Sequence, residues 1–181
     1  MKKSIALRER VHLSASSGNV VSFRGFSRET GLAPTKERKK EMDMNCAYCA
    51  EGALVDAFGI KIGELSASKV YLFKEQSHKG RCIVASKFHV SELVDLSEAD
   101  RNAFMADVCK VSNAIHKLFN PAKVNYGAYG DTGCHLHFHL VPKYTDEFDW
   151  GGTFEMNPKR TTLTEAEYAE LVASIKAELG L

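Results

Sequence analysis

Apolar residues recur at two spacings along this chain, and the wider spacing predicts two long helices. In residues 97–120 and 164–180 they return every three or four positions, as on one buried side of a helix. Each run opens on Ser or Thr followed three residues later by an acidic residue, which resembles a capping box. Asn120-Pro121 ends the first helix and Gly180 follows the second. The apolar positions are Phe104, Val108, Val111, Ile115 and Leu118, then Tyr168, Leu171, Val172, Ile175 and Leu179.

The narrower spacing predicts strands. Short apolar and β-branched runs are bounded by polar segments, and Gln76-Ser-His-Lys-Gly80 has the composition of a hairpin loop between two antiparallel strands. Helices and strands mix without a βαβ alternation, so we predict an α+β fold that layers an antiparallel sheet with helices. The predicted strands are residues 70–73, 82–85, 124–129 and 135–141, and a short helix is predicted at 53–58, after a tight turn at 46–49.

Length and composition describe one globular domain with an appendage. A chain of 181 residues with 44% hydrophobic and 26% charged residues can bury a core without disulfides. No stretch reaches the roughly 18 uncharged apolar residues that span a bilayer, and no continuous apolar segment follows the N-terminal lysines. We therefore expect a cytoplasmic protein without a membrane partner.

Charge divides the chain before Met42. Residues 1–41 hold ten Lys and Arg against four Glu, a net charge of +6, whereas residues 42–181 hold 14 basic against 19 acidic residues, a net charge of −5. The basic segment lacks apolar periodicity, so we expect a poorly ordered extension without chemistry; a targeting peptide and a non-native segment are alternatives. The domain then spans 42–181. Because the positive charge is not gathered on a folded face, general nucleic-acid binding is disfavoured.

The five cysteines, at 46, 49, 82, 109 and 134, are odd in number and include one close pair. This pattern favours metal or redox use over a disulfide framework. Cys82 and Cys109 fall within a predicted strand and a predicted helix, and we expect them and Cys134 to be small buried side chains.

The most informative residues are His135, His137 and His139, at alternate positions of a predicted strand. Because alternate side chains of a strand point to opposite faces, the three imidazoles line one face while the apolar residues between them pack behind. The glycines at 127, 130 and 133 bracket a turn whose N–H groups could approach an anion closely. A lone histidine is usually a surface or core residue, but three in strict alternation favour a functional site.

This H-φ-H-φ-H-φ-φ pattern at 135–141, followed by Pro142, resembles the signature of the histidine triad (HIT) family of nucleotide hydrolases and transferases. The resemblance covers the chain from about Met42 to the final helix. It implies a HIT-like α+β fold, an antiparallel sheet of about five strands packed with helices, and a homodimer. The other matching motifs are Asn125-Tyr-Gly127, Gly130, Cys46-x-x-Cys49 and Ser86-Lys-Phe-His89.

The resemblance to zinc-containing members implies a zinc ion held by Cys46, Cys49, His89 and His135. Two thiolates and two imidazoles complete a tetrahedron without a position for water, so such a zinc ion is structural. A redox C-x-x-C is disfavoured because it usually sits in a thioredoxin-like βαβ setting. Two unrelated free thiols are the remaining alternative.

The resemblance also implies that His137 attacks the α-phosphorus of a bound nucleotide and forms a nucleotidyl-histidine that water cleaves. His139 would contact the phosphate oxygens and stabilise their charge, and either His139 or Thr132 would supply or relay the leaving-group proton. Asn125 would hydrogen-bond the phosphate or the ribose, and Gly130 and Gly133 would present backbone amides to the phosphate.

Within the family, His139 and Leu136 favour the hydrolase branch, because the uridylyltransferase branch usually has Gln and Pro there. The expected substrate is a dinucleoside polyphosphate, a nucleoside phosphoramidate or an aminoacyl-adenylate, and no added magnesium is needed. Two alternatives stay open: a metal-dependent hydrolase with all three histidines as ligands, and a nucleotide-binding module with little turnover.

Some residues depart from the family pattern or lie outside it. Asp131 stands where Gln or Asn is usual, and a carboxylate there repels phosphates unless it faces elsewhere. His78 lies in no motif, and we expect it to be solvated. Trp150, the single tryptophan, is suited to stacking on a base, to core packing or to a dimer contact.

Overall fold

The computed structural model describes residues 42–131 and 133–181. The N-terminal extension and Thr132 lie outside these ranges, so their roles and the domain boundary at Met42 stay predictions. In the described part of the chain, no helix combines the length and the apolar character that crossing a membrane requires.

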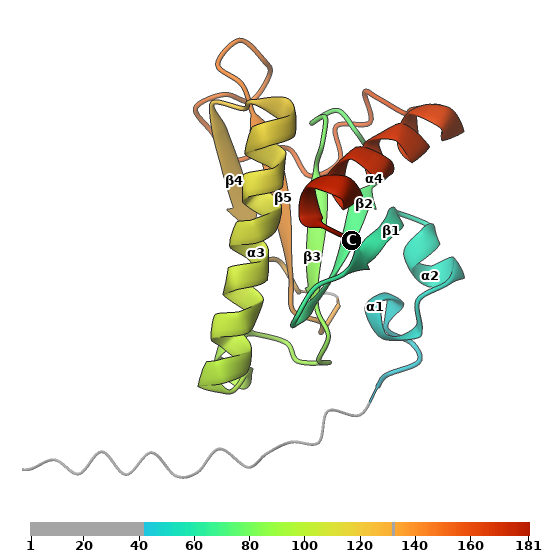
Figure 1. The fold of residues 1–181 in the computed structure, drawn as a ribbon, viewed down its shortest axis with the longest axis vertical. Helices are drawn as coiled ribbons and strands as arrows, with labels where there is room; N and C mark the ends of the chain where they lie inside the picture. The colour runs from blue at the N-terminus through green and yellow to red at the C-terminus, as the bar shows by residue number, and fades with distance from the viewer. Residues whose placement is uncertain (1–41, 132) are drawn as a thin grey trace, which may run out of the picture. The chain divides into compact units, whose positions relative to one another are not determined.

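Five antiparallel strands form one sheet (Figure 1). The strands are β1 (Gly59–Glu64), β2 (Ser68–Phe73), β3 (Cys82–Ser86), β4 (Lys123–Gly127) and β5 (His137–Lys143). The helices are α1 (Ala47–Ala50), α2 (Ala53–Asp56), α3 (Glu98–Phe119) and α4 (Glu165–Leu179), with a 3-10 turn, η1, at Leu93–Asp95. The spatial order β1-β2-β3-β5-β4 inserts β5 between β3 and β4. This architecture confirms the predicted α+β fold with an antiparallel sheet.

The two long helices, α3 and α4, cover one face of the sheet (Figure 1). Their apolar sides meet alternate residues of the central strands, including Leu72 of β2 and Val84 of β3, in the larger core. The apolar residues whose spacing predicts the helices are the residues that contact the sheet. Phe104 and Ile115 of α3, for example, are fully buried there.

The opposite face of the same strands carries a smaller cluster. Tyr71 of β2 and Ile83 of β3 pack there with Tyr48 of α1 and Val55 of α2. Since side chains alternate along a strand, β2 and β3 contribute to both clusters, one from each face. The candidate functional residues lie on this second face.

Both long helices begin and end where the sequence predicts. The Ser97 side chain accepts a hydrogen bond from the Asp100 backbone N–H at the start of α3, and Thr164 forms a capping box with Glu167 at the start of α4. Asn120 and Gly180 follow the two helices in the left-handed conformation, at φ 47° and 69°.

The strand ends differ from the predictions for local reasons. β1 was not predicted because its sequence alternates poorly, and Ile62 is its one deeply buried large side chain. β5 begins at His137 rather than 135, because the backbone N–H groups of His135 and Leu136 donate to Gly133 and Val90, outside the ladder. β4 ends at Gly127, and the helix predicted at 53–58 is the single turn α2.

A buried carboxylate fastens α3 to the turn between β1 and β2. Asp107 of α3 accepts three hydrogen bonds: from the Ser66 hydroxyl at 2.9 Å, from the Ala67 N–H at 2.8 Å and from the Ser68 hydroxyl at 2.8 Å. The Ala67 N–H and the Ser68 hydroxyl are buried, so the carboxylate supplies the acceptor that they need and aligns the edge of the sheet with the helix.

Asp107→Ala leaves the buried Ala67 N–H and Ser68 hydroxyl without an acceptor, and we expect it to lower the free energy of unfolding by about 2–4 kcal/mol. Urea denaturation followed by circular dichroism measures the loss. Asn113→Ala, at an exposed position of the same helix, is the control and should change the stability by less than about 0.5 kcal/mol. Equal stability of the two variants would contradict this account.

Candidate functional site

The three histidines come to one face of the sheet, as their spacing predicts. His137 lies directly opposite Ala85, and His139 lies opposite Ile83 on one side and Gly127 on the other. Directly opposed residues of antiparallel strands share a face, and Ala85 and Ile83 belong to the cluster away from α3 and α4. His135 precedes the strand and is buried, with its ring 5.1 Å from that of Tyr48.

His137 is held as a neutral ring with a free lone pair. Its Nδ1–H donates to the backbone carbonyl of His135 at 2.8 Å, because a carbonyl oxygen can only accept. Nε2 therefore carries the lone pair. Partial burial lowers the pKa of His137, so the neutral form is favoured at pH 7. The sequence did not indicate which carbonyl would hold the ring.

His139 has the opposite arrangement of protons. Nη2 of Arg81 lies 3.1 Å from Nδ1 of His139, and since a guanidinium only donates, Nδ1 accepts and the ring proton is on Nε2. Burial, and then the Arg81 cation, lower the pKa of His139 to about 3. Arg81 belongs to no motif in the sequence. Its position directly before β3 was the one feature that could have indicated a role at the site.

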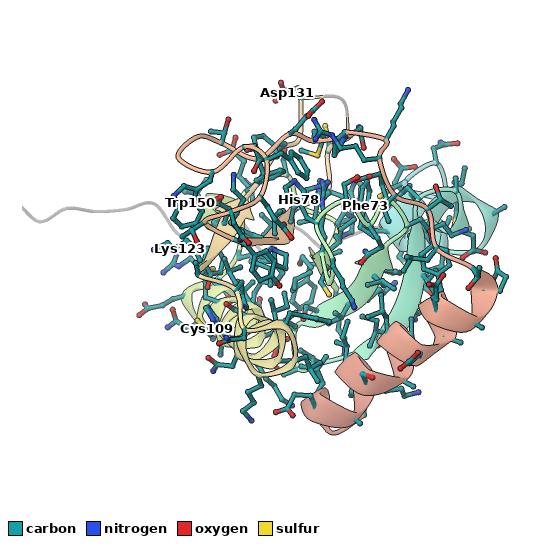
Figure 2. All side chains as sticks on the ribbon, turned by 90° about the horizontal axis from the view of Figure 1, so that it is seen from above. Phe73, His78, Cys109, Lys123, Asp131 and Trp150 are labelled. Atoms are coloured by element: carbon teal, nitrogen blue, oxygen red, sulfur yellow. The ribbon has the colours of Figure 1, made fainter. Side chains whose placement is uncertain are left out.

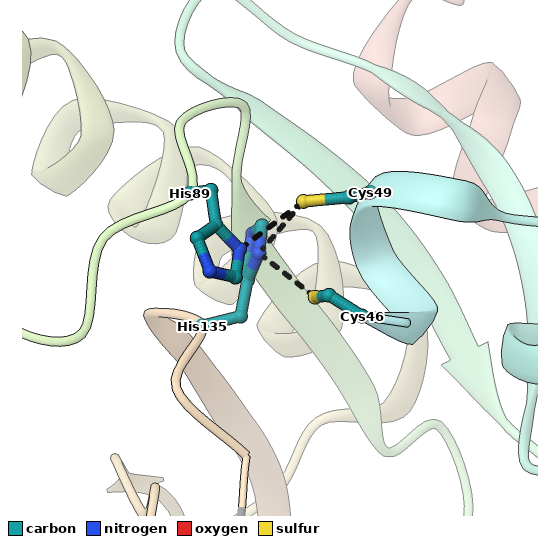
Figure 3. A group of neighbouring side chains, drawn as sticks. All are labelled: Cys46, Cys49, His89 and His135. Carbon is teal, nitrogen blue, oxygen red and sulfur yellow. Dashed lines mark hydrogen bonds between the residues drawn. The ribbon is translucent and has the colours of Figure 1, made fainter. Parts of the chain in front are cut away.

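Four potential metal ligands meet beside the triad (Figure 3). Cys46 directly precedes α1 and Cys49 lies within it, whereas His89 follows β3 and His135 precedes β5. The ligand atoms of all four residues lie within 4.8 Å of one another. Sγ of Cys46 is 3.3 Å from Nδ1 of His135, and Sγ of Cys49 is 3.2 Å from Nδ1 of His89. The sequence predicted this set, and the structure brings it together as a possible metal site.

The geometry of these four residues fits a zinc ion. Tetrahedral Zn–S and Zn–N bonds put sulfur and nitrogen ligands about 3.5 Å apart, close to the observed separations. The Nε2–H of His135 donates to the Ser86 carbonyl at 2.8 Å, which leaves the Nδ1 lone pair facing the two sulfur atoms. Burial lowers the pKa of His135 to about 4, so the ring is in the neutral form that binds metal.

Tyr48, between the two cysteines, links this cluster to the triad. Its buried ring centroid lies 5.1 Å from that of His135 and 5.1 Å from that of His137. Burial raises the pKa of its hydroxyl, so the ring packs as a neutral aromatic. The sequence gave no reason to single out Tyr48, because its role arises from the packing of α1 on the sheet.

A pocket of about 470 Å³ opens at His137. Gly130 and Asp131 line it, as does the segment before η1, whereas Gly133 is not part of its lining. Its lining includes two carboxylates, Glu92 and Asp131, and none of its described lining residues is Lys or Arg. Asp131, which differs from the residue usual in the family, therefore faces the pocket. The lining residues are Ser91, Glu92, Leu93, Val94, Ala128, Tyr129, Gly130, Asp131, His135, Leu136 and His137.

Asn125 lies on β4 directly opposite Val141, two positions from the residue that faces His139. It thus shares the face of the triad but does not line the pocket at His137. Its side-chain oxygen Oδ1 is buried without a hydrogen-bond partner, so an acceptor is available there.

The prediction that His78 is solvated was wrong. Its buried ring packs 4.8 Å from that of Phe148, and its Nε2 lies 3.4 Å from the Asp149 carboxylate. The same carboxylate lies 2.5 Å from Nζ of the buried Lys143. These contacts tie the segment after β5 to the loop before β3, an arrangement that sequence spacing does not reveal.

Other peripheral residues also differ from expectation. Cys109 and Cys134 are exposed rather than buried, whereas Cys82 is buried as predicted. Figure 2 shows Cys109 on α3, well below Asp131 in this view. Trp150 is 46% exposed and does not line the pocket at His137, so core packing does not explain it.

Comparisons with known proteins agree on one family. Residues 61–146 match the family model of the HIT domain. The adenosine 5'-monophosphoramidase hnt1 of Schizosaccharomyces pombe is 25% identical over 142 residues, which are 74% of this chain and 100% of that protein.

Solved structures share the fold. A histidine triad protein from Bradyrhizobium japonicum has a TM-score of 0.64 at 20% identity, over 71% of this chain and 96% of its own. A Zn-bound histidine triad family protein from Mycobacterium smegmatis has a TM-score of 0.54 at 21% identity, over 76% of this chain and 96% of its own. The comparisons thus confirm the predicted resemblance of this chain, with its alternating histidines and its C-x-x-C turn, to the histidine triad (HIT) family.

Proposed function

We propose that this protein hydrolyses a nucleoside phosphate derivative, or transfers its nucleotidyl group, through a covalent nucleotidyl-His137 intermediate. The observation that carries the proposal is the hydrogen bond from Nδ1 of His137 to the His135 carbonyl, because it leaves Nε2 as a neutral nucleophile beside a pocket. The relative hnt1, named an adenosine 5'-monophosphoramidase, supports an activity of this class.

In the first step, Nε2 of His137 forms a bond to the α-phosphorus as the bond from phosphorus to the leaving group breaks. The leaving group departs with the bonding electron pair and takes up a proton that comes from solvent. The His135 carbonyl stabilises the positive charge that develops on the attacking ring, since it accepts the Nδ1–H hydrogen bond. His139 donates from Nε2–H to the phosphate oxygens, on which negative charge accumulates.

In the second step, water attacks phosphorus, the bond from phosphorus to Nε2 breaks, and one water proton is released to solvent. The sum of the two steps consumes one water molecule and regenerates the neutral ring. Because His139 is held neutral, Thr132 is the better candidate for relaying the leaving-group proton. Asn125 would accept a hydrogen bond from the ribose through its free Oδ1, and backbone amides at Gly130 and Gly133 would hold the phosphate.

The charges of the pocket favour an amine leaving group. Glu92 and Asp131 repel a polyphosphate chain, whereas an amine, which is neutral or positive once released, is compatible with both. Of the substrates compatible with the triad, we therefore propose a nucleoside phosphoramidate ahead of a dinucleoside polyphosphate.

His137→Gly removes the nucleophile, and we expect hydrolysis of adenosine phosphoramidate to fall on the order of 10³-fold or more. Steady-state product formation measures this loss. Wild-type enzyme quenched in alkaline denaturant, in which the P–N bond of a nucleotidyl-histidine survives, should also gain the mass of one adenylyl group in intact-mass analysis, and the variant should not. His116→Ala, which removes an exposed imidazole from α3, is the control.

If His137→Gly kept the parental rate, the covalent route would be excluded. If the wild-type protein bound the nucleotide without forming products, a binding module would be favoured.

The three-histidine metal hydrolase is the less favoured alternative. Nδ1 of His135 faces the cysteine sulfur atoms, Nδ1 of His137 donates to a carbonyl and Nδ1 of His139 accepts from Arg81. Within the described residues, His137 and His139 belong to no group of converging metal ligands.

We further propose that Cys46, Cys49, His89 and His135 hold a structural zinc ion. The donor set, the tautomer of His135 and the Zn-bound relative of similar fold support this assignment. Four protein ligands leave no position for substrate, so the residues around the ion act by fastening α1, with Tyr48, against the triad.

We expect elemental analysis to find about one zinc ion per chain. Cys49→Ser should lose most of the zinc and lower the melting temperature by at least about 5 °C, whereas Cys109→Ser, at an exposed thiol outside the cluster, should change neither. During chelation, activity should fall only as fast as the circular dichroism signal. Activity lost while the fold persists would instead indicate a catalytic metal.

A homodimer belongs to the same proposal. β4 is an edge strand with unpaired backbone groups, and its Tyr126, whose hydroxyl lies 2.6 Å from that of Ser112 on α3, presents an aromatic ring that is 50% exposed. Sedimentation velocity should give twice the mass of one chain. Tyr126→Lys should shift the species toward monomer, whereas Tyr129→Lys, which alters a pocket residue, should not.

A further inference from the structure

Arg81 is a wholly buried cation next to the triad. Its guanidinium lies 4.1 Å from the centroid of the Phe73 ring and 5.3 Å from that of Phe154. Nη1 donates to the Met156 carbonyl at 2.6 Å, and Nη2 contacts the Met156 sulfur at 2.8 Å. Two aromatic rings and the segment after β5 thus enclose the charge.

No carboxylate among the residues that the structure describes forms an ion pair with this guanidinium. Its acceptors are all neutral, and Nε is buried without a partner. Burial lowers the pKa of Arg81 to about 10, and the more distant Glu75 carboxylate only partly opposes that effect. A buried cation without a carboxylate destabilises a fold relative to a neutral side chain of similar size. Stability therefore does not explain why arginine stands at this position, and its remaining contact has to be considered.

That contact is with His139. The Arg81 Nη2–H donates to Nδ1 of His139, and the other close neighbours of this imidazole are the rings of His137 and Phe73, with centroids at 5.2 and 5.6 Å. No other polar partner for the His139 ring is present in residues 42–131 and 133–181. Arg81 is thus the group that decides which ring nitrogen carries the proton.

The consequence for the ring is a fixed protonation state. An imidazolium has no acceptor, so a ring that accepts from Arg81 must be neutral, and its single proton must be on Nε2. Without Arg81, the ring could carry its proton on either nitrogen. In one of these two tautomers Nε2 would present a lone pair, which repels a phosphate oxygen instead of binding it.

We propose that Arg81 is a positioning residue that holds His139 neutral with its proton on Nε2, and so makes His139 a permanent hydrogen-bond donor to the phosphate. The role in turnover rests on the proposed nucleotidyl transfer at His137. The effect on the tautomer does not, because it follows from the contact between Arg81 and His139. Arg81 also contributes positive charge behind the donor, in a site of low polarity where charge acts strongly.

The first test reads the tautomer in the wild-type protein by NMR of ¹⁵N-histidine-labelled chain, with His139→Gln used to assign the His139 signals. We expect Nδ1 of His139 to be unprotonated and Nε2 to be protonated across the neutral range. A protonated Nδ1 would overturn the proposal without the need for any Arg81 variant.

The second test uses Arg81→Met and Arg81→Lys. Arg81→Met should convert His139 to a mixture of tautomers, and Arg81→Lys, whose ammonium can still donate, should keep most of the Nε2–H form. Arg160→Met is the matched control, because Arg160 also lies over an aromatic ring, 4.1 Å from Phe148, but is exposed. Amide NMR spectra of all variants check that the fold persists. An unchanged tautomer in folded Arg81→Met would contradict the proposal.

The third test is kinetic, with adenosine phosphoramidate. We expect Arg81→Met to lower kcat about 10-fold or more and to change KM less than about threefold, with partial recovery in Arg81→Lys. A large rise in KM alone would mean that Arg81 binds substrate directly and would overturn the positioning role. If His137→Gly retained activity, the proposed function would fail while the NMR result still decided the effect of Arg81 on His139.

Discussion

The insertion of β5 between β3 and β4 is the constraint on which the rest of the structure depends. Because β5 pairs on both sides, its backbone is fixed, and alternation sends His137 and His139 to one face. Phe138 and Leu140 then point to the other face, where they contact the core beneath α3. A shift of the β5 register by one residue would send the histidines to the core and the apolar residues to the opposite face. The register that packs the core is therefore also the register that places the histidines on one face.

Three neighbouring imidazoles are compatible with this buried setting because each is neutral and each has an assigned partner. The Ser86 carbonyl takes the Nε2 proton of His135, the His135 carbonyl takes the Nδ1 proton of His137, and Arg81 occupies the Nδ1 lone pair of His139. Burial lowers the pKa of all three rings. The site thus combines a lone pair on one ring with a donor on the next, which is what attack on a phosphate requires.

The possible metal site and the triad share parts of one framework. His135 belongs to both, since its ring joins Cys46 and Cys49 while its backbone carbonyl holds His137. Tyr48 packs against both rings from the turn between the cysteines. The cysteine turn therefore contacts His137 directly through Tyr48, and it contacts His135, whose carbonyl holds the His137 ring.

The sequence by itself determined both long helices and their caps, the α+β class and the shared face of the triad, because periodicity and local hydrogen bonds act over a few residues. It indicated the four grouped ligands only through the resemblance of its motifs to the HIT family. Only the tertiary structure decided that Arg81 contacts His139, that Tyr48 packs on two triad rings and that His78 is buried. Each of these contacts joins residues distant along the chain, and single-sequence patterns carry no information about such pairs.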